Sequence, residues 1–365
     1  MRFLFLNQYF PPDPAPTGVL FGEIAERLRA AGHAVDFVAA RQDYRAGQKQ
    51  GGRTIRELKA LGRMLLDACR RPRPDVVVSG TSPPCLLVVA TLTALRFRAR
   101  SVHWIMDMYP EIAVGLGEIG PGRLARVVGG AMGWSYRRAA AVVALDADMA
   151  VHLRRHGVEP CFVRPWVFAP VLRQLAAAQA APTAEWTWIY SGNLGRAHEW
   201  ETLLAAQAIL EARGAEVRLL FQGGGPSWPA AQGRARELGL EQCVWRDYVP
   251  EAELPESLRR CAVLAVTQRP EAQGLLWPSK LGLVLSLPRA ILWVGPKEGA
   301  IAELLRAVPG AGVFAPGQAA EVADWLEARR GAALPERAAL DPAVHREEAL
   351  RAWQELLTTA GAATA

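Results

Sequence analysis

The stretch 186–210 joins a short aromatic and β-branched run, a glycine-rich break and a helical pattern. The break, SGNLG at 191–195, predicts a turn, because glycine and asparagine tolerate backbone angles that other residues avoid. A strand, a turn and a helix in this order aim backbone N–H groups and a helix N-terminus at an anion. Asn193, Arg196 and His198 would add side-chain donors. An ordinary strand-to-helix connection is the alternative interpretation.

Two carboxylates, Asp107 and Glu111, lie four residues apart across a proline in the string DMYPE. Paired carboxylates can act as general acid/base and nucleophile. His103, three residues before Met106 in the preceding apolar run, is interpreted as a packed strand residue. His152 and His156 have the spacing of zinc ligands on a helix, but no third ligand and no HExxH string accompany them. The five cysteines form no CxxC pair, so we expect reduced thiols and no metal site.

The net charge of +6 comes from the first half of the chain, where ten lysines and arginines lie between Arg41 and Arg73 against three acidic residues. Such a basic strip predicts an anionic surface or an anionic substrate as partner, and a merely solvated surface is the alternative. Nucleic acid is not expected, because aromatic residues are not interleaved with the basic ones. No signal-peptide pattern and no run of about 18 apolar residues is present, so we expect a cytoplasmic protein without a spanning helix.

Strand and helix patterns alternate along the first half, which implies βαβ units, right-handed crossovers and a parallel sheet. We predict strands at 2–10, 34–40, 75–79, 102–106, 141–145 and 161–163, and helices at 19–31, 53–69, 85–95, 124–140 and 149–156. The helix at 85–95 is apolar enough to be buried. The string PPDPAPTG before the first helix predicts a rigid loop. The stretch 164–185 is predicted to be an interdomain linker.

The second half repeats the same alternation. We predict strands at 186–190, 216–221, 243–245, 262–267, 290–295 and 310–315, and helices at 199–213, 229–238, 249–261, from 278, 298–308, 318–330 and 343–358. The string QGGGP at 222–226 is predicted to be a turn. At 365 residues the chain is long enough for two domains. We expect an α/β protein with one domain over 1–168, a second over 169–342, and a C-terminal helix, 343–365, that packs back on the first. Ligands in such folds bind beyond the carboxyl ends of the strands.

Six strings in order carry a resemblance to a known family. They are PPDPAPTG, DMYPE, YSGNLGRAHEWETLL, FQGGGP, VPEAELPESLRRC and EAQGLLWPSKL. Together the strings resemble family-4-type glycosyltransferases, in the bacterial polysaccharide and O-antigen branch. The resemblance implies a GT-B fold, with two Rossmann-like doubly wound domains facing across a cleft. It also implies metal-independent transfer of a sugar from a nucleotide diphosphate sugar, with retention of configuration. The leaving phosphate itself would help to deprotonate the acceptor.

In the first half the resemblance assigns the small residues Thr17 and Gly18 to the donor phosphates or sugar, with Thr17 replacing a glycine frequent in the family. Asp107 becomes the acidic candidate near the reacting centre, while Glu111 is structural or faces the acceptor. Many family members carry a histidine just before the aspartate, where this chain has Met106.

In the second half Arg196 resembles the basic residue that neutralises the donor diphosphate, and its guanidinium can hold phosphate through two bonds. The family's partner lysine is missing, which leaves His198 or Lys280 to replace it. Glu271 matches the first of two spaced glutamates and would contact the donor sugar, whereas Ser279 stands at the second. The remaining donor-site positions are Gly192, Asn193, Gly223, Gly224, Tyr248, Gln273, Gly274, Leu275 and Leu276. Backbone groups near Tyr248 would read uracil.

The implied donor is a UDP-sugar, such as a UDP-hexose or UDP-N-acetylhexosamine, and no cofactor is expected. The implied acceptor is a sugar or a polyprenyl-diphosphate-linked molecule, with peripheral contact between strip 41–73 and the anionic inner face of the plasma membrane. A nucleotide-sugar 2-epimerase would need other carboxylates, and a dinucleotide oxidoreductase would need GxGxxG after the first strand. A non-catalytic subunit with the same fold stays open, because the second glutamate and the histidine are missing.

Overall fold

The computed structural model describes residues 1–11, 15–40, 53–177 and 186–362, which form two compact units. Unit 1 comprises Met1–Pro165, Gly274–Trp277 and Arg346–Ala365, and unit 2 comprises Trp166–Gln273 and Pro278–His345. No helix within the described ranges is long and apolar enough to cross a membrane. Strip 41–73 falls partly outside the described residues, which resume at residue 53.

Unit 1 is built on a parallel six-stranded sheet with the order β2-β1-β3-β4-β5-β6. Its strands are β1 (Arg2–Asn7), β2 (Ala34–Ala39), β3 (Val76–Ser79), β4 (Arg100–Trp104), β5 (Ala141–Ala144) and β6 (Cys161–Phe162). Its first helices are α1 (Pro16–Ala30), α2 (Arg53–Cys69), α3 (Leu86–Phe97), α4 (Glu111–Gly115), α5 (Arg123–Arg138) and α6 (Ala147–Arg155). β3 is buried at every residue, as expected of a central strand covered on both faces.

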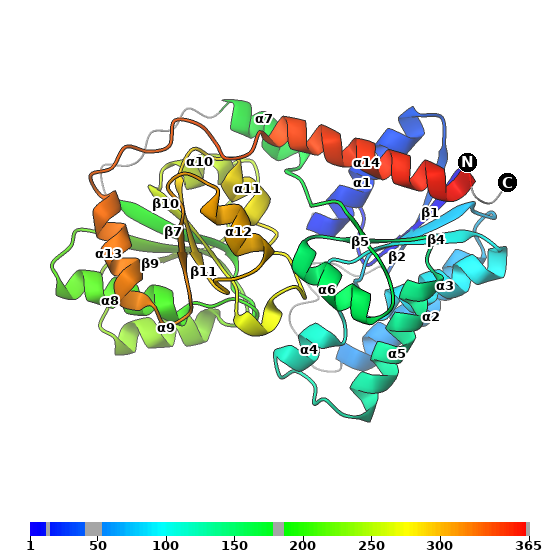
Figure 1. Ribbon diagram of the computed structural model, residues 1–365, viewed down its shortest axis with the longest axis horizontal. Helices are drawn as coiled ribbons and strands as arrows, with labels where there is room; N and C mark the ends of the chain where they lie inside the picture. The colour runs from blue at the N-terminus through cyan, green and yellow to red at the C-terminus, as the bar shows by residue number, and fades with distance from the viewer. Residues whose placement is uncertain (12–14, 41–52, 178–185, 363–365) are drawn as a thin grey trace. The chain divides into compact units, whose positions relative to one another are not determined.

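The helix α14 (Pro342–Ala362) completes unit 1 beside α1 (Figure 1). Trp353 of α14 packs against Trp104 of β4 with ring centroids 4.8 Å apart, and both side chains are fully buried. Arg346 Nε donates to the buried carboxylate of Glu23 at 2.8 Å. An apolar contact with β4 and an ion pair with α1 therefore hold this helix in unit 1.

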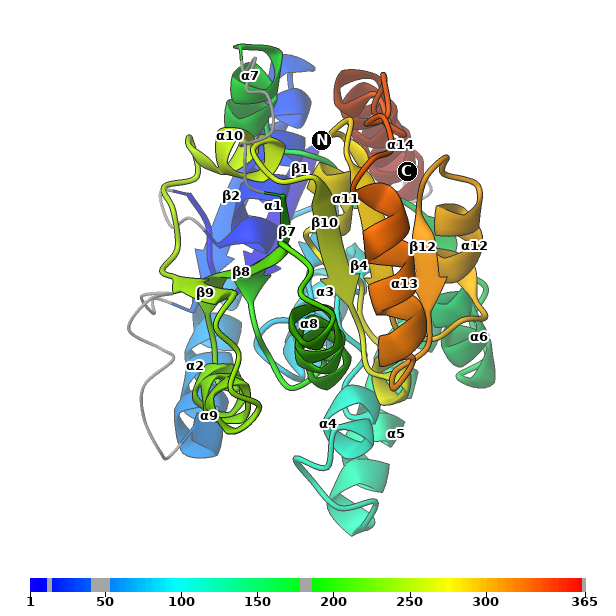
Figure 2. The same ribbon diagram turned by 90° about the vertical axis from the view of Figure 1, so that its left-hand side faces the viewer.

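Unit 2 contains a second parallel sheet, with the order β12-β11-β10-β7-β8-β9. The strands are β7 (Thr187–Asn193), β8 (Arg218–Gly224), β9 (Cys243–Arg246), β10 (Val263–Thr267), β11 (Ala290–Val294) and β12 (Gly312–Phe314). The helices are α7 (Ala169–Ala177), α8 (Glu201–Ala212), α9 (Trp228–Glu237), α10 (Leu254–Arg259), α11 (Leu281–Leu285), α12 (Ala300–Arg306) and α13 (Ala319–Arg329), with a short 3₁₀ turn, η1 (Pro270–Ala272). Figure 2 shows α8 and α13 beside this sheet, where their apolar residues join one core.

The order of strands and helices follows the predictions except for α4, which was not predicted, and three further details were wrong. β7 continues through Ser191, Gly192 and Asn193, and β8 through Gly224, because these residues pair in register instead of turning. β4 begins at Arg100, two residues before the predicted strand. The predicted linker 164–185 contains helix α7 over Ala169–Ala177. The predicted domain boundaries, at residues 168 and 342, each lie three residues from a limit of the two units, at 165 and 345. They stay predictions.

Candidate functional site

The carboxyl ends of β7 and β10 form the switch point of the second sheet. From β7 the chain proceeds to β8 and β9 on one side, whereas β10 and β11 extend the sheet on the other. Ligands of doubly wound sheets bind outside such a point, because the loops on its two sides diverge. His198 reaches this edge and its Nδ1 lies 3.0 Å from the carbonyl oxygen of Thr267. A carbonyl only accepts, so Nδ1 carries the ring proton.

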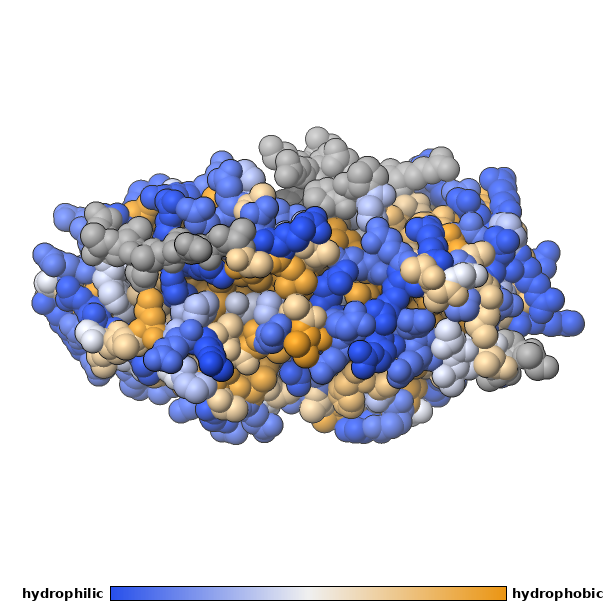
Figure 3. All heavy atoms as spheres, turned by 90° about the horizontal axis from the view of Figure 1, so that it is seen from above, coloured by the Kyte–Doolittle hydropathy of each residue, from blue (hydrophilic) through white to orange (hydrophobic). Residues whose placement is uncertain are grey.

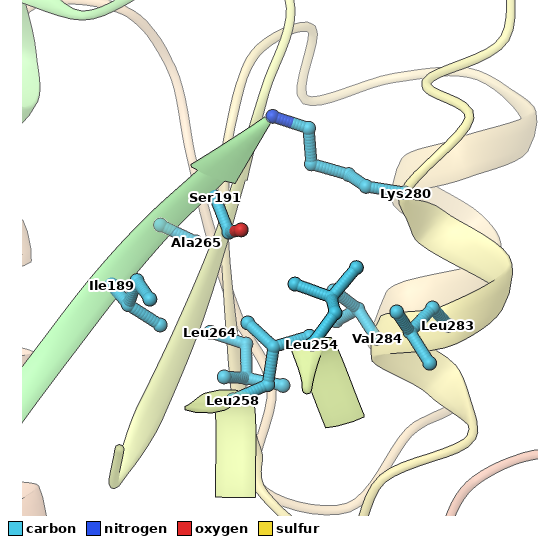
Figure 4. A pocket seen from close by; sticks show the side chains of 9 residues that line it. All are labelled: Ile189, Ser191, Leu254, Leu258, Leu264, Ala265, Lys280, Leu283 and Val284. Atoms are coloured by element: carbon cyan, nitrogen blue, oxygen red, sulfur yellow. The ribbon is translucent and has the colours of Figure 1, made fainter. Parts of the chain in front are cut away.

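Lys280 extends from the start of α11 to the end of β7 (Figure 4). Its Nζ lies 3.4 Å from the centroid of the Tyr190 ring and is as close to a Cβ built on Gly192. The nitrogen is buried and has no hydrogen-bond partner among the described residues. Burial holds the pKa of Lys280 well below its usual range. A buried amino group with unused donors marks a place where an anion would be stabilised.

His198 does not supply a positive charge at this edge. Burial, followed by the nearby charge of Lys280, lowers the pKa of His198 to about 3, against a weaker effect of the Thr267 carbonyl. The imidazole is therefore neutral at physiological pH. Of the two residues that could replace the missing lysine, only Lys280 can carry a charge.

A small cavity of about 30 Å³ lies below Lys280, between α10, α11 and the strands β7 and β10. Its walls are apolar apart from Lys280 and Ser191, whose hydroxyl points into it in Figure 4. Ser257 Oγ donates to Gln222 Oε1 at 2.6 Å, and Gln222 Nε2 donates to Ser191 Oγ at 3.1 Å. Because Ser191 Oγ accepts a hydrogen bond from Gln222, the hydroxyl proton of Ser191 can be donated to a further acceptor.

Sequence reasoning missed Ser191, Gln222 and Ser257. Ser191 and Gln222 are direct cross-strand partners in the β7–β8 register. The only signal would have been the extension of both strands into the segments that were predicted to be turns.

The glycines at the end of β8 stand in close contacts, and at Gly223 the contact is with backbone. Gly223 has φ +136°, and a Cβ there would overlap the carbonyl oxygen of Gly192. A Cβ on Gly224 would lie 3.1 Å from the Tyr248 ring, which is itself exposed. The contact with Gly192 explains why residue 223 is glycine without any ligand. The predicted approach of donor phosphates to Gly223 stays a prediction.

Other predicted donor-site residues of unit 2 stand on its surface. Asn193, Arg196, Glu271 and Ser279 are exposed, with Glu271 inside η1. Gln273 Nε2 donates to the carbonyl oxygen of Glu298 at 2.9 Å. A ligand can reach the four exposed side chains from the solvent.

Asp107 follows β4 in unit 1, and the segment Gly274–Trp277 lies beside it. The N–H of Met108 donates to the carbonyl oxygen of Leu275 at 2.8 Å, and Asp107 pairs with Leu276 in an antiparallel bridge. The N–H of Asp107 donates to Thr81 Oγ1 at 3.1 Å. Burial raises the pKa of Asp107 to about 6. The aspartate thus stands in a loop fixed from two sides, with a carboxyl poised near neutral pH.

Gly274 is the close-contact point of the same segment. It has φ +68°, and a Cβ there would lie 2.8 Å from the backbone carbonyl carbon of Asp148. Leu275 and Leu276 were predicted to offer backbone amides to the donor. The carbonyl of Leu275 and the pairing of Leu276 with Asp107 fasten this segment to the rest of unit 1, and the role of the two amides toward a donor stays a prediction.

The loop before α1 is packed tightly on the first sheet. Asn7 Nδ2 donates to Tyr9 O at 2.9 Å and to Thr17 Oγ1 at 3.2 Å. A Cβ on Gly18 would lie 2.8 Å from Tyr9 O, so the approach of the loop backbone is sufficient reason for this glycine. A role of Thr17 and Gly18 toward a donor stays a prediction.

Glu111 and His103 are held by local partners. Glu111 Oε1 lies 3.0 Å from His156 Nε2. Burial would raise the pKa of Glu111, but the hydrogen bond and charge of His156 lower it overall. His103 is fully buried with Nδ1 2.8 Å from Ser79 Oγ, which fits the packed strand residue expected there. In the described part of the chain, no group of three or more His, Cys, Asp or Glu side chains could hold a metal ion.

Comparison with known proteins finds a family model that matches part of the first half of the chain. Residues 17–166 match the family model described as "Glycosyl transferase 4-like domain". The chain is 29% identical over 255 residues to a probable glycosyltransferase, WbjE, of Pseudomonas aeruginosa. The match covers 65% of this chain and only 61% of that relative's length.

Solved structures share the architecture of the whole chain. Sucrose-phosphate synthase from Thermosynechococcus elongatus matches 100% of this chain and 98% of its own, with a TM-score of 0.67 and 13% identity. The lipopolysaccharide outer core galactosyltransferase WaaB matches 98% and 99%, with a TM-score of 0.62 and 12% identity. HepE of Anabaena, solved in complex with UDP, matches 100% and 98%, with a TM-score of 0.56 and 13% identity. The predicted GT-B fold is therefore confirmed.

Proposed function

Because residues 17–166 belong to the glycosyl transferase 4-like family within a GT-B fold, we propose that the protein is a glycosyltransferase that uses a nucleotide diphosphate sugar. The donor is a UDP-sugar, carrying a hexose or an N-acetylhexosamine, and transfer retains the configuration at the sugar. The complex of HepE with UDP supports uridine as the base, although that complex concerns a distant relative.

One observation carries the proposal: the buried Nζ of Lys280, without a hydrogen-bond partner in the described chain, stands at the switch point of the second sheet. A diphosphate beside β7 would neutralise this group, and the Ser191 hydroxyl could donate to the same ligand. Arg196, exposed in the following loop, would add a guanidinium. The charge that develops on the leaving diphosphate would thus meet fixed donors, the principal means of electrostatic catalysis.

The remaining assignments keep the roles implied by the resemblance. Glu271 contacts the donor sugar from η1, and Asp107 stands near the reacting centre in a loop of unit 1. The acceptor is a sugar or a lipid-linked diphosphate, whose hydroxyl loses its proton to the leaving phosphate. Transfer through positioning and charge stabilisation needs no covalent sugar–enzyme intermediate.

Titration calorimetry with UDP and UDP-sugars tests this function in Lys280→Met, with Lys297→Met as the control. Lys297 is an exposed lysine of unit 2, so its replacement removes the same charge from the surface. We expect Lys280→Met to weaken UDP binding by about 30- to 150-fold, the effect of losing a charge-assisted interaction of about 2–3 kcal/mol. Lys297→Met should bind like the wild type.

The same measurements separate the alternatives. Absence of UDP binding by the wild-type protein would refute the proposal. Tight UDP binding without release of UDP from any UDP-sugar, with or without acceptor, would favour a non-catalytic subunit. Thermal unfolding of Lys280→Met controls for folding, and we expect no loss of stability, because methionine suits a buried apolar position better than a lysine.

A further inference from the structure

Gln222 is a buried polar side chain of β8, with 2% of its surface exposed. On the face of the molecule in Figure 3, hydrophobic residues lie in patches among hydrophilic ones, which is ordinary for a protein surface. A polar side chain in the interior is more informative, because its burial costs free energy unless new hydrogen bonds replace those with water. The partners of Gln222 therefore bear on what this part of unit 2 does.

The Gln222 amide connects two other elements of unit 2, the strand β7 and the helix α10. Ser257 Oγ of α10 donates to Gln222 Oε1 at 2.6 Å, and Gln222 Nε2 donates to Ser191 Oγ of β7 at 3.1 Å. Ser191 and Gln222 are direct partners in the β7–β8 register, which brings their side chains together on one face of the sheet. We name these three side chains the serine–glutamine network.

The two distances indicate the direction of the hydrogen bonds in the network. A hydroxyl donates to an oxygen at about 2.5–3.0 Å, and an N–H donates to an oxygen at about 2.7–3.2 Å. The Ser257 distance lies only in the first range and the Ser191 distance only in the second. An amide turned the other way would reverse both assignments. Ser191 Oγ therefore accepts from Gln222 and keeps its own proton for another partner.

Ser257 supplies the proton that orients the Gln222 amide. A serine inside a helix commonly donates to the carbonyl oxygen four residues earlier, as Ser135 of α5 does to Ala131 at 3.1 Å. Ser257 instead directs its hydroxyl to Gln222, although it stands within α10. Without this donor the amide could turn over, and its oxygen would then accept the proton of Ser191.

The other end of the network lies beside Lys280. Ser191 and Lys280 line the same cavity of about 30 Å³, which has room for a water-sized group such as one phosphate oxygen (Figure 4). Lys280 Nζ only donates hydrogen bonds, and Ser191, whose oxygen already accepts from Gln222, has a proton to give. An ionised phosphate matches two donors at one cavity, because its oxygens only accept.

We propose that Gln222 and Ser257 are positioning residues of the donor site. They hold the Ser191 oxygen as an acceptor, so that the Ser191 proton is left for an oxygen of the donor diphosphate beside Lys280. A site with this polarity favours a phosphate over a ligand group that must itself donate. The inference rests on the proposed function, because it requires that UDP binds at Lys280.

Titration calorimetry with UDP tests the network in Ser191→Ala, Gln222→Met and Ser257→Ala, and in the last two changes combined with Ser191→Ala. We expect Ser191→Ala to weaken UDP binding by about tenfold, the effect of one hydrogen bond to a charged group. Gln222→Met and Ser257→Ala should each weaken it by about threefold. In the Ser191→Ala background they should cause no further loss, because they act only through Ser191.

Two further variants separate positioning from a merely structural role. Ser257→Thr keeps the hydroxyl and should restore UDP binding to within about twofold of the wild type. Gln207→Met removes another buried glutamine of unit 2, which accepts from Trp188 Nε1 at 3.0 Å and donates to the Val217 carbonyl oxygen at 2.9 Å. This control should lower the thermal unfolding midpoint without changing the affinity for UDP. Thermal unfolding of every variant shows whether it folds.

Uridine, which has no phosphate, identifies the group that Ser191 contacts. In competition against UDP, uridine should bind the wild type and Ser191→Ala equally well, and an equal loss for both ligands would overturn the assignment to the diphosphate. Losses from Gln222→Met or Ser257→Ala that persist in the Ser191→Ala background would overturn the positioning role. UDP binding that is weakened in Lys280→Met but unchanged in Ser191→Ala would overturn this inference and leave the proposed function standing. Absence of UDP binding by the wild type would overturn both.

Discussion

The Nζ atom of Lys280 lies 3.4 Å from the centroid of the Tyr190 ring, at the end of the strand that opens the second sheet. The hydroxyl of Tyr190 donates to the carbonyl oxygen of Asn193 at 3.0 Å, so the ring is fixed at both ends. An aromatic face attracts a cation but does not replace the hydrogen bonds of water. Lys280 is thus held in place with its donors unused, which is the arrangement that a phosphate would complete.

Ligand binding at Lys280 should be coupled to proton uptake. Burial lowers the pKa of Lys280 in the free protein, and a bound diphosphate would raise it again. The affinity for UDP is then highest below the pKa that Lys280 has in the free protein. It falls as the pH rises from there through the pKa that Lys280 has in the complex. Calorimetry in two buffers of different ionisation enthalpy measures the protons taken up. We expect uptake by the wild type and none at this site in Lys280→Met, and equal uptake by both proteins would contradict the assignment.

Asp107→Asn should stabilise the protein in a pH-dependent way. The pKa of Asp107 is raised from 3.8 to about 6 by burial, so the carboxylate is disfavoured in the folded state. As the pH rises from 3.8 to about 6, the unfolded state ionises first and the wild type loses stability. Above pH 6 the asparagine variant should be more stable by up to about 3 kcal/mol, and below pH 3.8 the two should be equal. Urea unfolding at a series of pH values measures the difference, and a constant difference would show that Asp107 ionises freely in the folded protein.

Gly223→Ala should destabilise the protein by several kcal/mol, because its Cβ would overlap the Gly192 carbonyl at a backbone angle that favours glycine. Gly233→Ala is the matched control: it lies within α9, and a Cβ there meets nothing within 4 Å. Alanine at that helical position should instead stabilise by about 0.5–1 kcal/mol. Thermal unfolding of both variants provides the comparison. Similar midpoints for the two would mean that β7 and β8 do not approach each other at this point.

The alternation of apolar runs and helical patterns was enough to predict the order of the strands and of the helices other than α4 and α7. The ends of β7 and β8 were not predictable, because Gly192 and Gly223 signal a turn by composition and join a strand only through their cross-strand pairing. The neutral state of the His198 imidazole could not be predicted from the sequence either. It depends on burial beside Lys280, 82 residues later in the chain, which no local pattern encodes.

Residues of the candidate site could be named from the sequence, but the contacts that hold them could not. Lys280 was singled out as a possible replacement for the missing lysine, which stays a prediction, and its burial against Tyr190 becomes visible only in three dimensions. Gly18 looked like a phosphate-approach residue, although contact with the Tyr9 carbonyl already demands glycine. Ser191, Gln222 and Ser257 went unnoticed because serine and glutamine carry no motif, and only their hydrogen bonds connect them.

Unit 1 includes two segments from late in the chain, Gly274–Trp277 and Arg346–Ala365, so its folding is linked to the order in which the chain is synthesised. A nascent chain that has reached residue 165 has all six strands of the first sheet, but it lacks the partner of Met108 and the tryptophan that covers Trp104. Unit 1 therefore cannot finish folding before unit 2 has been translated, although domains generally fold as they leave the ribosome. A gene fragment encoding 1–165 alone would leave Trp104 without this cover and should yield an unstable product.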